Sequence, residues 1–312
     1  MSNPFVFIVG CPRSGTTLLK RMVNAHSKIA MPPEESHWIP RLYHKRKLTP
    51  GGLVSPMLLS RLVALPRFLA LGISHDQLLK LAGNGQPVSY STFVTGIFDL
   101  YGRAQGKELV GDKTPDHVRW LDALHALWPQ ARVVHLVRDG RDVCLSIANW
   151  PKAHGKNPGT FPTWKDDPLS TTALWWELNV RLGRQFASSL GPELYCEVRY
   201  ESLVSNPDGE CAALCSFLGL PYEDAMLRFH QGKTQTEPGL SSKEAWLPVT
   251  PGLRDWKSQM PGEDIERFEA AVGELLDELG YARAFPQPRR ERLENASQIR
   301  ELFTRDPRWF RF

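Results

Sequence analysis

The chain has 312 residues, of which 42% are hydrophobic and 23% charged, and its formal net charge is +4. These values are ordinary for a globular protein of one large domain, and so slight a charge gives no case for nucleic-acid binding, which needs a concentrated basic stripe. The five cysteines show no CxxC spacing and no long uncharged apolar run occurs, so we expect neither a disulfide framework, a metal site, a signal peptide nor a transmembrane segment, and a reducing, cytoplasmic compartment fits best.

The first predicted element, residues 5–9, is a buried strand that leads through a glycine loop, residues 10–15, into a helix starting at Thr16. An unbroken apolar run is typical of a strand that is covered on both faces. The free N–H groups and the dipole at the helix start favour an anion there. Gly10 and Gly15 have the spacing of a phosphate-binding loop, but Thr16 replaces the lysine of nucleoside-triphosphate loops, and the cation of the loop is Arg13. The loop therefore suits a phosphate-like group better than ATP with magnesium.

A short extended segment, residues 27–31, ends at two prolines and is followed directly by the ionisable side chains of Glu34, Glu35 and His37. Residues 53–105 are then predicted as helices, beginning with an apolar stretch that prolines interrupt. We interpret these helices as a cap inserted over the core. A membrane-surface role or a site for an apolar substrate is the alternative.

Two further strands are predicted at residues 108–111 and 132–137, and each leads into polar side chains. The first is followed by Asp112 and Lys113, and the second, which is the clearer buried strand, by Arg138. The helices that follow these strands are expected at residues 116–128 and 143–150.

The rest of the chain continues the alternation of strands and helices. We expect a long loop at residues 151–169, irregular chain at 232–253, and a charged, partly helical C-terminal extension at 286–312. The remaining expected elements are helices at residues 174–189, 210–218 and 263–279 and a strand at 193–200. This alternation predicts one α/β domain over residues 1–312, with a doubly wound parallel sheet flanked by helices.

Four candidate site segments directly follow predicted strands. They contain Arg13, the pair Glu34 and Glu35, Lys113, and Arg138. In a parallel sheet the carboxyl ends of the strands share one edge, where ligands bind in doubly wound folds. We therefore expect these side chains to face one crevice.

At these residues the chain resembles the sulfotransferases that use 3′-phosphoadenosine 5′-phosphosulfate (PAPS). PRSGTTLL at residues 12–19 is similar to the family's 5′-phosphosulfate loop, and VRDGRDVCLS at residues 137–146 to its 3′-phosphate motif. Three more segments resemble tyrosylprotein sulfotransferases locally: EESHWIPR at 34–41, GDKTP at 111–115 and RYESLVSNP at 199–207. The resemblance implies a P-loop-type fold and transfer of a sulfonate from PAPS to a hydroxyl, with PAP as the product.

The resemblance also implies roles for individual residues. It gives a catalytic glutamate at Glu35 when the segment is aligned as a block, or at Glu34 when residues are counted without a gap from Arg13, and His37 is a third candidate for the base. Lys113 and Arg13 would stabilise the charge that develops on the leaving phosphate. The residues expected to hold the nucleotide are Arg13, Ser14, Gly15, Thr16, Thr17, Arg138, Ser146, Tyr200, Gly252 and Leu253. No metal is expected to take part.

The acceptor cannot be read from these motifs. We expect a hydroxyl on a small molecule, lipid, glycan or natural product. The oligomeric state is left open by the sequence, and a homodimer is one alternative. Two other functions compete with sulfotransfer. A P-loop kinase would use the same loop, although Thr16 argues against it, and a non-catalytic nucleotide-binding module would leave Glu34, Glu35 and Lys113 unexplained.

Overall fold

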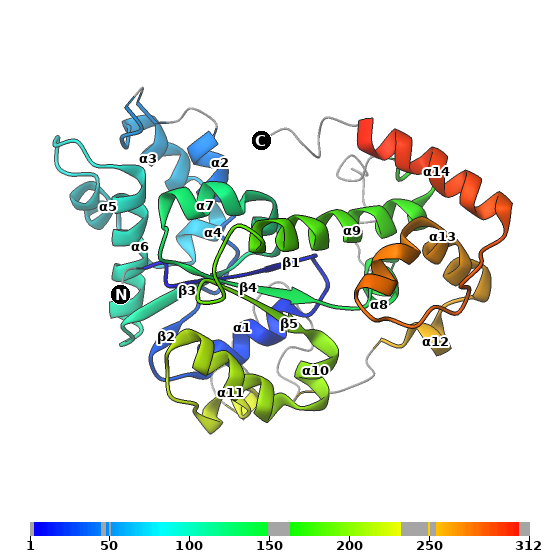
Figure 1. Cartoon of the computed structure of the whole chain (residues 1–312). Helices are drawn as coiled ribbons and strands as arrows, with labels where there is room; N and C mark the ends of the chain where they lie inside the picture. Colours follow the sequence, from blue (N-terminus) through cyan, green and yellow to red (C-terminus); the bar gives the residue numbers. More distant parts are fainter. Residues whose placement is uncertain are drawn as a thin grey trace. The chain divides into compact units, whose positions relative to one another are not determined.

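The computed structural model describes residues 3–44, 48–49, 51–148, 163–231, 249 and 254–305. The chain divides into two compact units, each built from separate segments (Figure 1). The first unit comprises Met1–Gly10, Gly15–Leu136 and Gly183–Thr250, and the second comprises Cys11–Ser14, Val137–Leu182 and Pro251–Phe312. The expectation of a single domain over the whole chain stays a prediction.

A five-stranded sheet organises the first unit, as Figure 1 shows. Strand β1 pairs in parallel with β3 on one side and β4 on the other, and β2 pairs in parallel with β3. The strand order is β2-β3-β1-β4-β5, so the chain moves outward from β1 in both directions, as a doubly wound sheet does. The strands are β1 (Val6–Gly10), β2 (Ile29–Ala30), β3 (Leu109–Lys113), β4 (Arg132–Val137) and β5 (Tyr195–Arg199). The predicted fold class is confirmed.

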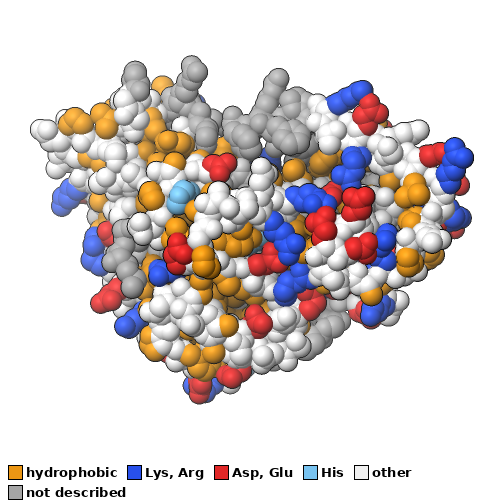
Figure 2. All heavy atoms as spheres, in the orientation of Figure 1, with side chains coloured by type: hydrophobic (Ala, Val, Ile, Leu, Met, Phe, Trp, Pro, Cys, Tyr) orange, Lys and Arg blue, Asp and Glu red, His pale blue; other side chains and the backbone are white. Residues whose placement is uncertain are grey.

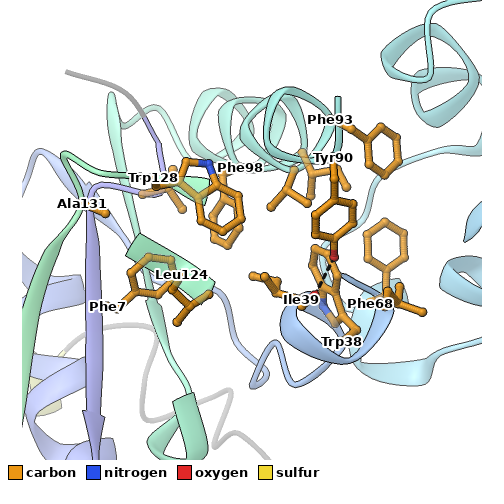
Figure 3. Close-up of a cluster of buried hydrophobic side chains, with 14 of the residues drawn as sticks. Phe7, Trp38, Ile39, Phe68, Tyr90, Phe93, Phe98, Leu124, Trp128 and Ala131 are labelled. Atoms are coloured by element: carbon orange, nitrogen blue, oxygen red, sulfur yellow. Dashed lines mark hydrogen bonds between the residues drawn. The ribbon is translucent and has the colours of Figure 1, made fainter. Parts of the chain in front are cut away.

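Both faces of the sheet are covered. This explains why the sequence of β1 is apolar throughout. Successive side chains of a strand point to opposite faces. Phe7 and Val9 join one buried cluster, drawn in Figure 3, whereas Val6 and Ile8 join another. An alternating pattern would have left a polar side chain in one of these two cores.

The predicted cap packs its buried side chains into the cluster of Figure 3. It consists of α3 (Pro56–Val63), α4 (Pro66–Leu69), α5 (His75–Leu81) and α6 (Tyr90–Ala104). Prolines begin α3 and α4, where a missing N–H costs nothing. Phe68 and Tyr90 are buried in the cluster, and the Tyr90 hydroxyl donates to the backbone oxygen of Ile39 at 2.8 Å. The helices therefore pack over the core as expected, and their role toward an acceptor stays a prediction.

The other helices of the first unit flank the sheet or connect its strands. They are α1 (Thr16–Ala25), α2 (Trp38–His44), η1 (Pro115–Trp120), α7 (Leu121–Leu127), α10 (Tyr200–Ser205), α11 (Pro207–Leu218), η3 (Asp224–Met226) and η4 (Phe229–Gln231). Within the described ranges, no helix is long and apolar enough to cross a membrane.

The second unit is helical and has a core of its own around Trp176 and Phe268. It contains α8 (Gly140–Ala148), α12 (Trp256–Gln259), α13 (Gly262–Glu278) and α14 (Arg290–Arg305), while α9 (Pro168–Ala187) is shared by both units. Around α13 and α14 the visible surface in Figure 2 mixes cationic and anionic side chains, in keeping with ion pairs such as Arg289 with Glu266.

Several expectations need correction. The helix expected at residues 116–128 is the 3-10 helix η1 followed by the shorter α7. Helix α9 begins at Pro168 instead of residue 174, because the Asp167 carboxylate accepts the N–H groups of Leu169 and Ser170 at 3.0 Å and caps it. Strand β3 extends through Lys113, and the strand expected at residues 193–200 covers only Tyr195–Arg199. Tyr200 instead starts α10, which we did not predict. Most of the loop expected at 151–169 and of the irregular chain at 232–253 lies outside the described residues.

Candidate active site

The loop after β1 has a backbone that only glycine can adopt at two positions. Gly10 and Gly15 have φ angles of 148° and 102°. A Cβ at Gly10 would lie 2.4 Å from the backbone oxygen of Leu136, and one at Gly15 would lie 2.4 Å from the ring of Tyr200. Close packing at the end of the strand thus requires glycine at both positions. The ring of Tyr200 packs against the loop at Gly15.

Two other residues of this loop carry features of a ligand cradle. Arg13 has a φ of 79°, which is unusual for a residue with a side chain and is found most often at functional sites. Ser14 is fully buried, and among the described residues its hydroxyl has no hydrogen-bond partner. A buried hydroxyl without a partner is costly, so an anion that accepts from it would be stabilised.

In the first unit, Glu35 lies against Lys113. The Lys113 ammonium donates to Glu35 Oε1 at 2.7 Å and lies 3.4 Å from the hydroxyl of Thr17, the second residue of α1. The Lys113 side chain is 2% exposed and that of Glu35 is 21% exposed. The end of β3, the start of α1 and the segment after β2 therefore meet at one place.

The other carboxylate oxygen of Glu35 receives two more nitrogen donors. His37 Nε2 lies 3.0 Å and Arg67 Nη1 3.2 Å from Oε2, and His37 Nδ1 faces Asp116 at 3.7 Å. Burial alone would raise the pKa of Glu35, but the hydrogen bond from His37 and the charge of Lys113 outweigh it and place that pKa well below its usual range.

The other candidates of this segment take different places. The structure sets Glu35, not Glu34, against Lys113, and the charge of Glu34 acts on Lys20. The Lys20 ammonium donates to the backbone oxygen of Pro33 at 2.7 Å. Burial, and then the nearby charge of Lys113, lower the pKa of Lys20 to about 7.

In the second unit, Arg13 lies beside the motif that follows β4. Arg13 Nε donates to the hydroxyl of Ser146 on α8 at 3.0 Å. Arg138 is buried, and its guanidinium donates to the carboxylate of Asp142 at 3.1 Å. The indole of Trp176 donates to the backbone oxygen of Arg138 at 3.0 Å. Arg138 thus lies just before α8 and Ser146 lies within it, and both the backbone and the side chain of Arg138 are hydrogen-bonded.

The same motif anchors the start of α12. The N–H of Trp256 donates to Asp142 at 2.9 Å, and the guanidinium of Arg141 lies 3.6 Å from the centre of the Trp256 ring. Arg141 itself is buried in ion pairs with Asp139 and Glu269. Gly252 and Leu253, expected to bind the nucleotide, lie outside the described residues, and the described chain resumes at Arg254.

The sequence alone missed several of these partners. Arg67 and Thr114 carry no local signal, because the contact of Arg67 with Glu35 and the hydrogen bond from the N–H of Ser36 to the Thr114 hydroxyl join distant parts of the chain. Asp142 was within reach of sequence reasoning, since it lies one helical turn after Arg138 on α8. Among the residues that the structure describes, no group of three His, Cys, Asp or Glu side chains is arranged to hold a metal ion.

Known proteins share both the sequence pattern and the fold. A sequence profile described as the sulfotransferase family matches residues 4–224. Protein-tyrosine sulfotransferase A of Caenorhabditis elegans is 25% identical, with 90% of this chain and 68% of the relative covered. The nodulation protein NoeE of Sinorhizobium fredii is 28% identical over 91% of this chain and 67% of its own length.

A solved structure supports the fold. The sulfotransferase domain of the Synechococcus PCC 7002 olefin synthase matches with a TM-score of 0.57 at 22% identity, covering 98% of this chain and 96% of that one. The profile match covers most of the chain and includes both motifs described above, the loop after β1 and the segment after β4. The chain therefore belongs to the sulfotransferase family.

Proposed function

We propose that this sulfotransferase moves a sulfonate group from PAPS to an acceptor hydroxyl, with Glu35 as the general base. The observation that carries the proposal is the contact of 2.7 Å between Glu35 and the buried Lys113, beside Thr17 at the start of α1. A carboxylate and a cation at the anion-binding end of a P-loop-type helix are the two groups that such a transfer needs. PAPS supplies the activated sulfonate and leaves as PAP.

The residues of the loop after β1 fit the phosphosulfate end of PAPS. The start of α1 offers backbone N–H groups, and the buried hydroxyl of Ser14 lacks a partner among the described residues. We assign Arg13, Ser14, Gly15, Thr16 and Thr17 to this end. Tyr200, packed against Gly15, limits the space beside it.

The residues after β4 fit the 3′-phosphate end. Arg138 is held by Asp142 before any ligand arrives, and an arginine oriented in advance loses less entropy when it binds a phosphate. Ser146 adds a hydroxyl from the same helix. We assign Arg138 and Ser146 to this phosphate, and Gly252 and Leu253 stay predictions.

The contact between Glu35 and Lys113 also explains how one carboxylate can be held ionised and still act as a base. While Lys113 donates to it, the low pKa keeps Glu35 ionised but weakly basic. If Lys113 turns toward negative charge that builds nearby, Glu35 loses one of the partners that lower its pKa and becomes a stronger base. His37 remains the third candidate, and its position on Oε2 suits a partner of Glu35 better than a replacement for it.

The acceptor is proposed as a hydroxyl on a small molecule, lipid, glycan or natural product. Arg67 connects the cap to Glu35, which supports the view that the acceptor enters beside α4. A kinase is the rival enzyme, and Thr16 in the lysine position argues against it.

The decisive experiment compares PAP, ADP and ATP in thermal unfolding without added metal. At a hundredfold excess over Kd a ligand stabilises the folded state by about 2.7 kcal/mol, so PAP should raise the Tm by about 5 °C or more. ADP and ATP serve as matched controls, because they lack the 3′-phosphate. Equal stabilisation by ATP would contradict the proposal. If PAP stabilises the protein selectively, transfer of radiolabelled sulfonate from PAPS to a panel of alcohols would identify the acceptor class.

A further inference from the structure

The segment that carries Glu35 is held on both sides by side chains with no role in the proposal so far. On one side, Lys20 donates to the backbone oxygen of Pro33 at 2.7 Å. On the other, the N–H of Ser36 donates to the hydroxyl of Thr114 at 2.8 Å, in a contact that is fully buried. Glu35 lies between these two hydrogen bonds.

One anchor follows the strand that carries Lys113, and the other lies on the helix that carries Thr17, a neighbour of Lys113. Thr114 directly follows Lys113, and Lys20 lies on α1 with Thr17, whose hydroxyl is 3.4 Å from the Lys113 ammonium. Any shift of the end of β3 therefore moves Lys113 and the anchor of the Glu35 segment together. The separation between Glu35 and Lys113 is therefore set by these hydrogen-bonded backbone segments as well as by the two flexible side chains.

The backbone that carries Thr114 is itself fixed in place. Its backbone is extended, with φ −133° and ψ 102°, so it continues the direction of β3 and shares a face with Asp112. Asp112 is completely buried, and one of its carboxylate oxygens lies 3.2 Å from His117 Nδ1. Burial raises the pKa of Asp112, but the contact with His117 outweighs it and keeps the carboxyl ionised. This buried contact lies two residues before Thr114, on the same strand end.

We propose that Thr114 and Lys20 are positioning residues that set Glu35 against Lys113, an inference that rests on the proposed function. Neither needs to touch donor or acceptor. Thr114 acts through the N–H of Ser36, and Lys20 acts through the carbonyl of Pro33. Since a displacement of about 1 Å can cost about a hundredfold in rate, the loss of the buried anchor should affect turnover more than binding.

The test replaces Thr114 by valine, which keeps the shape and removes the hydroxyl. Thr114→Val should lower kcat about 10- to 100-fold and leave the KM for PAPS within about twofold. Thr114→Ser should restore most of the rate, because it returns the acceptor for the Ser36 N–H. Thr172→Val is the matched control. That buried hydroxyl donates to the backbone oxygen of Pro168 within α9, so its loss should leave kcat unchanged.

A second readout does not depend on activity. In the donor-free protein, the carboxyl of Glu35 can be titrated by carbon-13 NMR, with Glu35→Gln to assign the signal. Thr114→Val should raise the pKa of Glu35, because the segment no longer holds the carboxylate at Lys113, and Thr114→Ser should reverse the shift. Lys20→Met should lower kcat less, about fivefold, since water can replace the ammonium at the carbonyl of Pro33.

The outcomes separate the two proposals. If the wild-type protein transfers no sulfonate, the proposed function fails, while the titration of Glu35 still decides the role of Thr114. If Thr114→Val is folded and changes neither kcat nor that titration, the positioning role is overturned. Should the valine variant not fold, Thr114→Ala against Thr114→Ser provides the same comparison.

Discussion

The residues around Glu35 in the first unit and those around Arg138 and Arg141 in the second differ in how they balance charge. We call these two groups the first and the second centre. In the first unit, the single carboxylate of Glu35 meets the nitrogen donors of Lys113, His37 and Arg67. In the second, two buried arginines are paired with carboxylates: Arg138 with Asp142, and Arg141 with Asp139 and Glu269. A surplus of cationic groups around a carboxylate suits a place where negative charge develops, whereas paired arginines are oriented before a ligand arrives. This contrast supports the proposal that the first centre serves chemistry and the second serves binding.

Removal of the carboxylate in the first centre should have the largest effect. Glu35→Gln is expected to lower kcat about 10²- to 10⁴-fold, the usual contribution of a general base, while PAP still raises the Tm as in the wild type. Glu34→Gln is the matched control and should stay within about threefold, because Glu34 does not face Lys113. A larger loss in the Glu34 variant, measured by initial rates at saturating PAPS, would reassign the base and undo the comparison.

Removal of the cation should come next and should also move the pH profile. Lys113→Met is expected to lower kcat about 100-fold, since a donor aimed at developing charge is lost, with a smaller change in PAP affinity. Because Lys113 lowers the pKa of Glu35, the variant should need a higher pH to ionise that carboxyl, and the acid limb of kcat/KM should shift upward. Lys80→Met, on the exposed surface of α5, is the control. An unshifted acid limb would mean that Glu35 is not the group that titrates.

In the second centre, the expected loss is in affinity. Arg138→Gln should weaken PAP binding about 10- to 100-fold, the value of a hydrogen bond to a charged group, with kcat at saturating PAPS nearly unchanged. Asp142→Asn should weaken it less, because it loosens Arg138 without removing it. Isothermal titration calorimetry with PAP measures both, and Arg290→Gln on the surface of α14 is the control. Equal losses in kcat and affinity would contradict the division between chemistry and binding.

The smallest expected effect concerns His135, where burial prevails over charge. His135 is fully buried in β4, its Nδ1 lies 2.6 Å from the hydroxyl of Tyr195, and burial lowers its pKa to about 4. The unfolded chain, with an ordinary pKa of about 6.5, binds this proton more readily. Stability should therefore fall as the pH drops from about 6.5 toward 4. Urea unfolding of the wild type and His135→Gln across this range checks it. The variant should show a flatter pH dependence, and parallel curves would argue against a neutral His135.

Much of the fold was readable from the sequence because it depends on local patterns. The continuous apolar run of β1, the glycines after it and the run of β4 predict strands and a loop from neighbouring residues alone. The start of α9 and the existence of α10 were missed, since a capping aspartate and the turn at Tyr200 look like ordinary loop residues until the chain around them is placed.

The residue types of the site and their places after strands were likewise determined by the sequence, which left open whether Glu34 or Glu35 is the base. Only the tertiary structure decided which of them meets Lys113, and it added Arg67 and Thr114. The contacts of Lys113 with Glu35 and of Ser36 with Thr114 each join residues 78 positions apart, and that of Arg67 with Glu35 joins residues 32 apart. Local sequence sets backbone preferences over a few residues, whereas the direction in which a side chain faces across such separations depends on how the strand ends and the cap pack together.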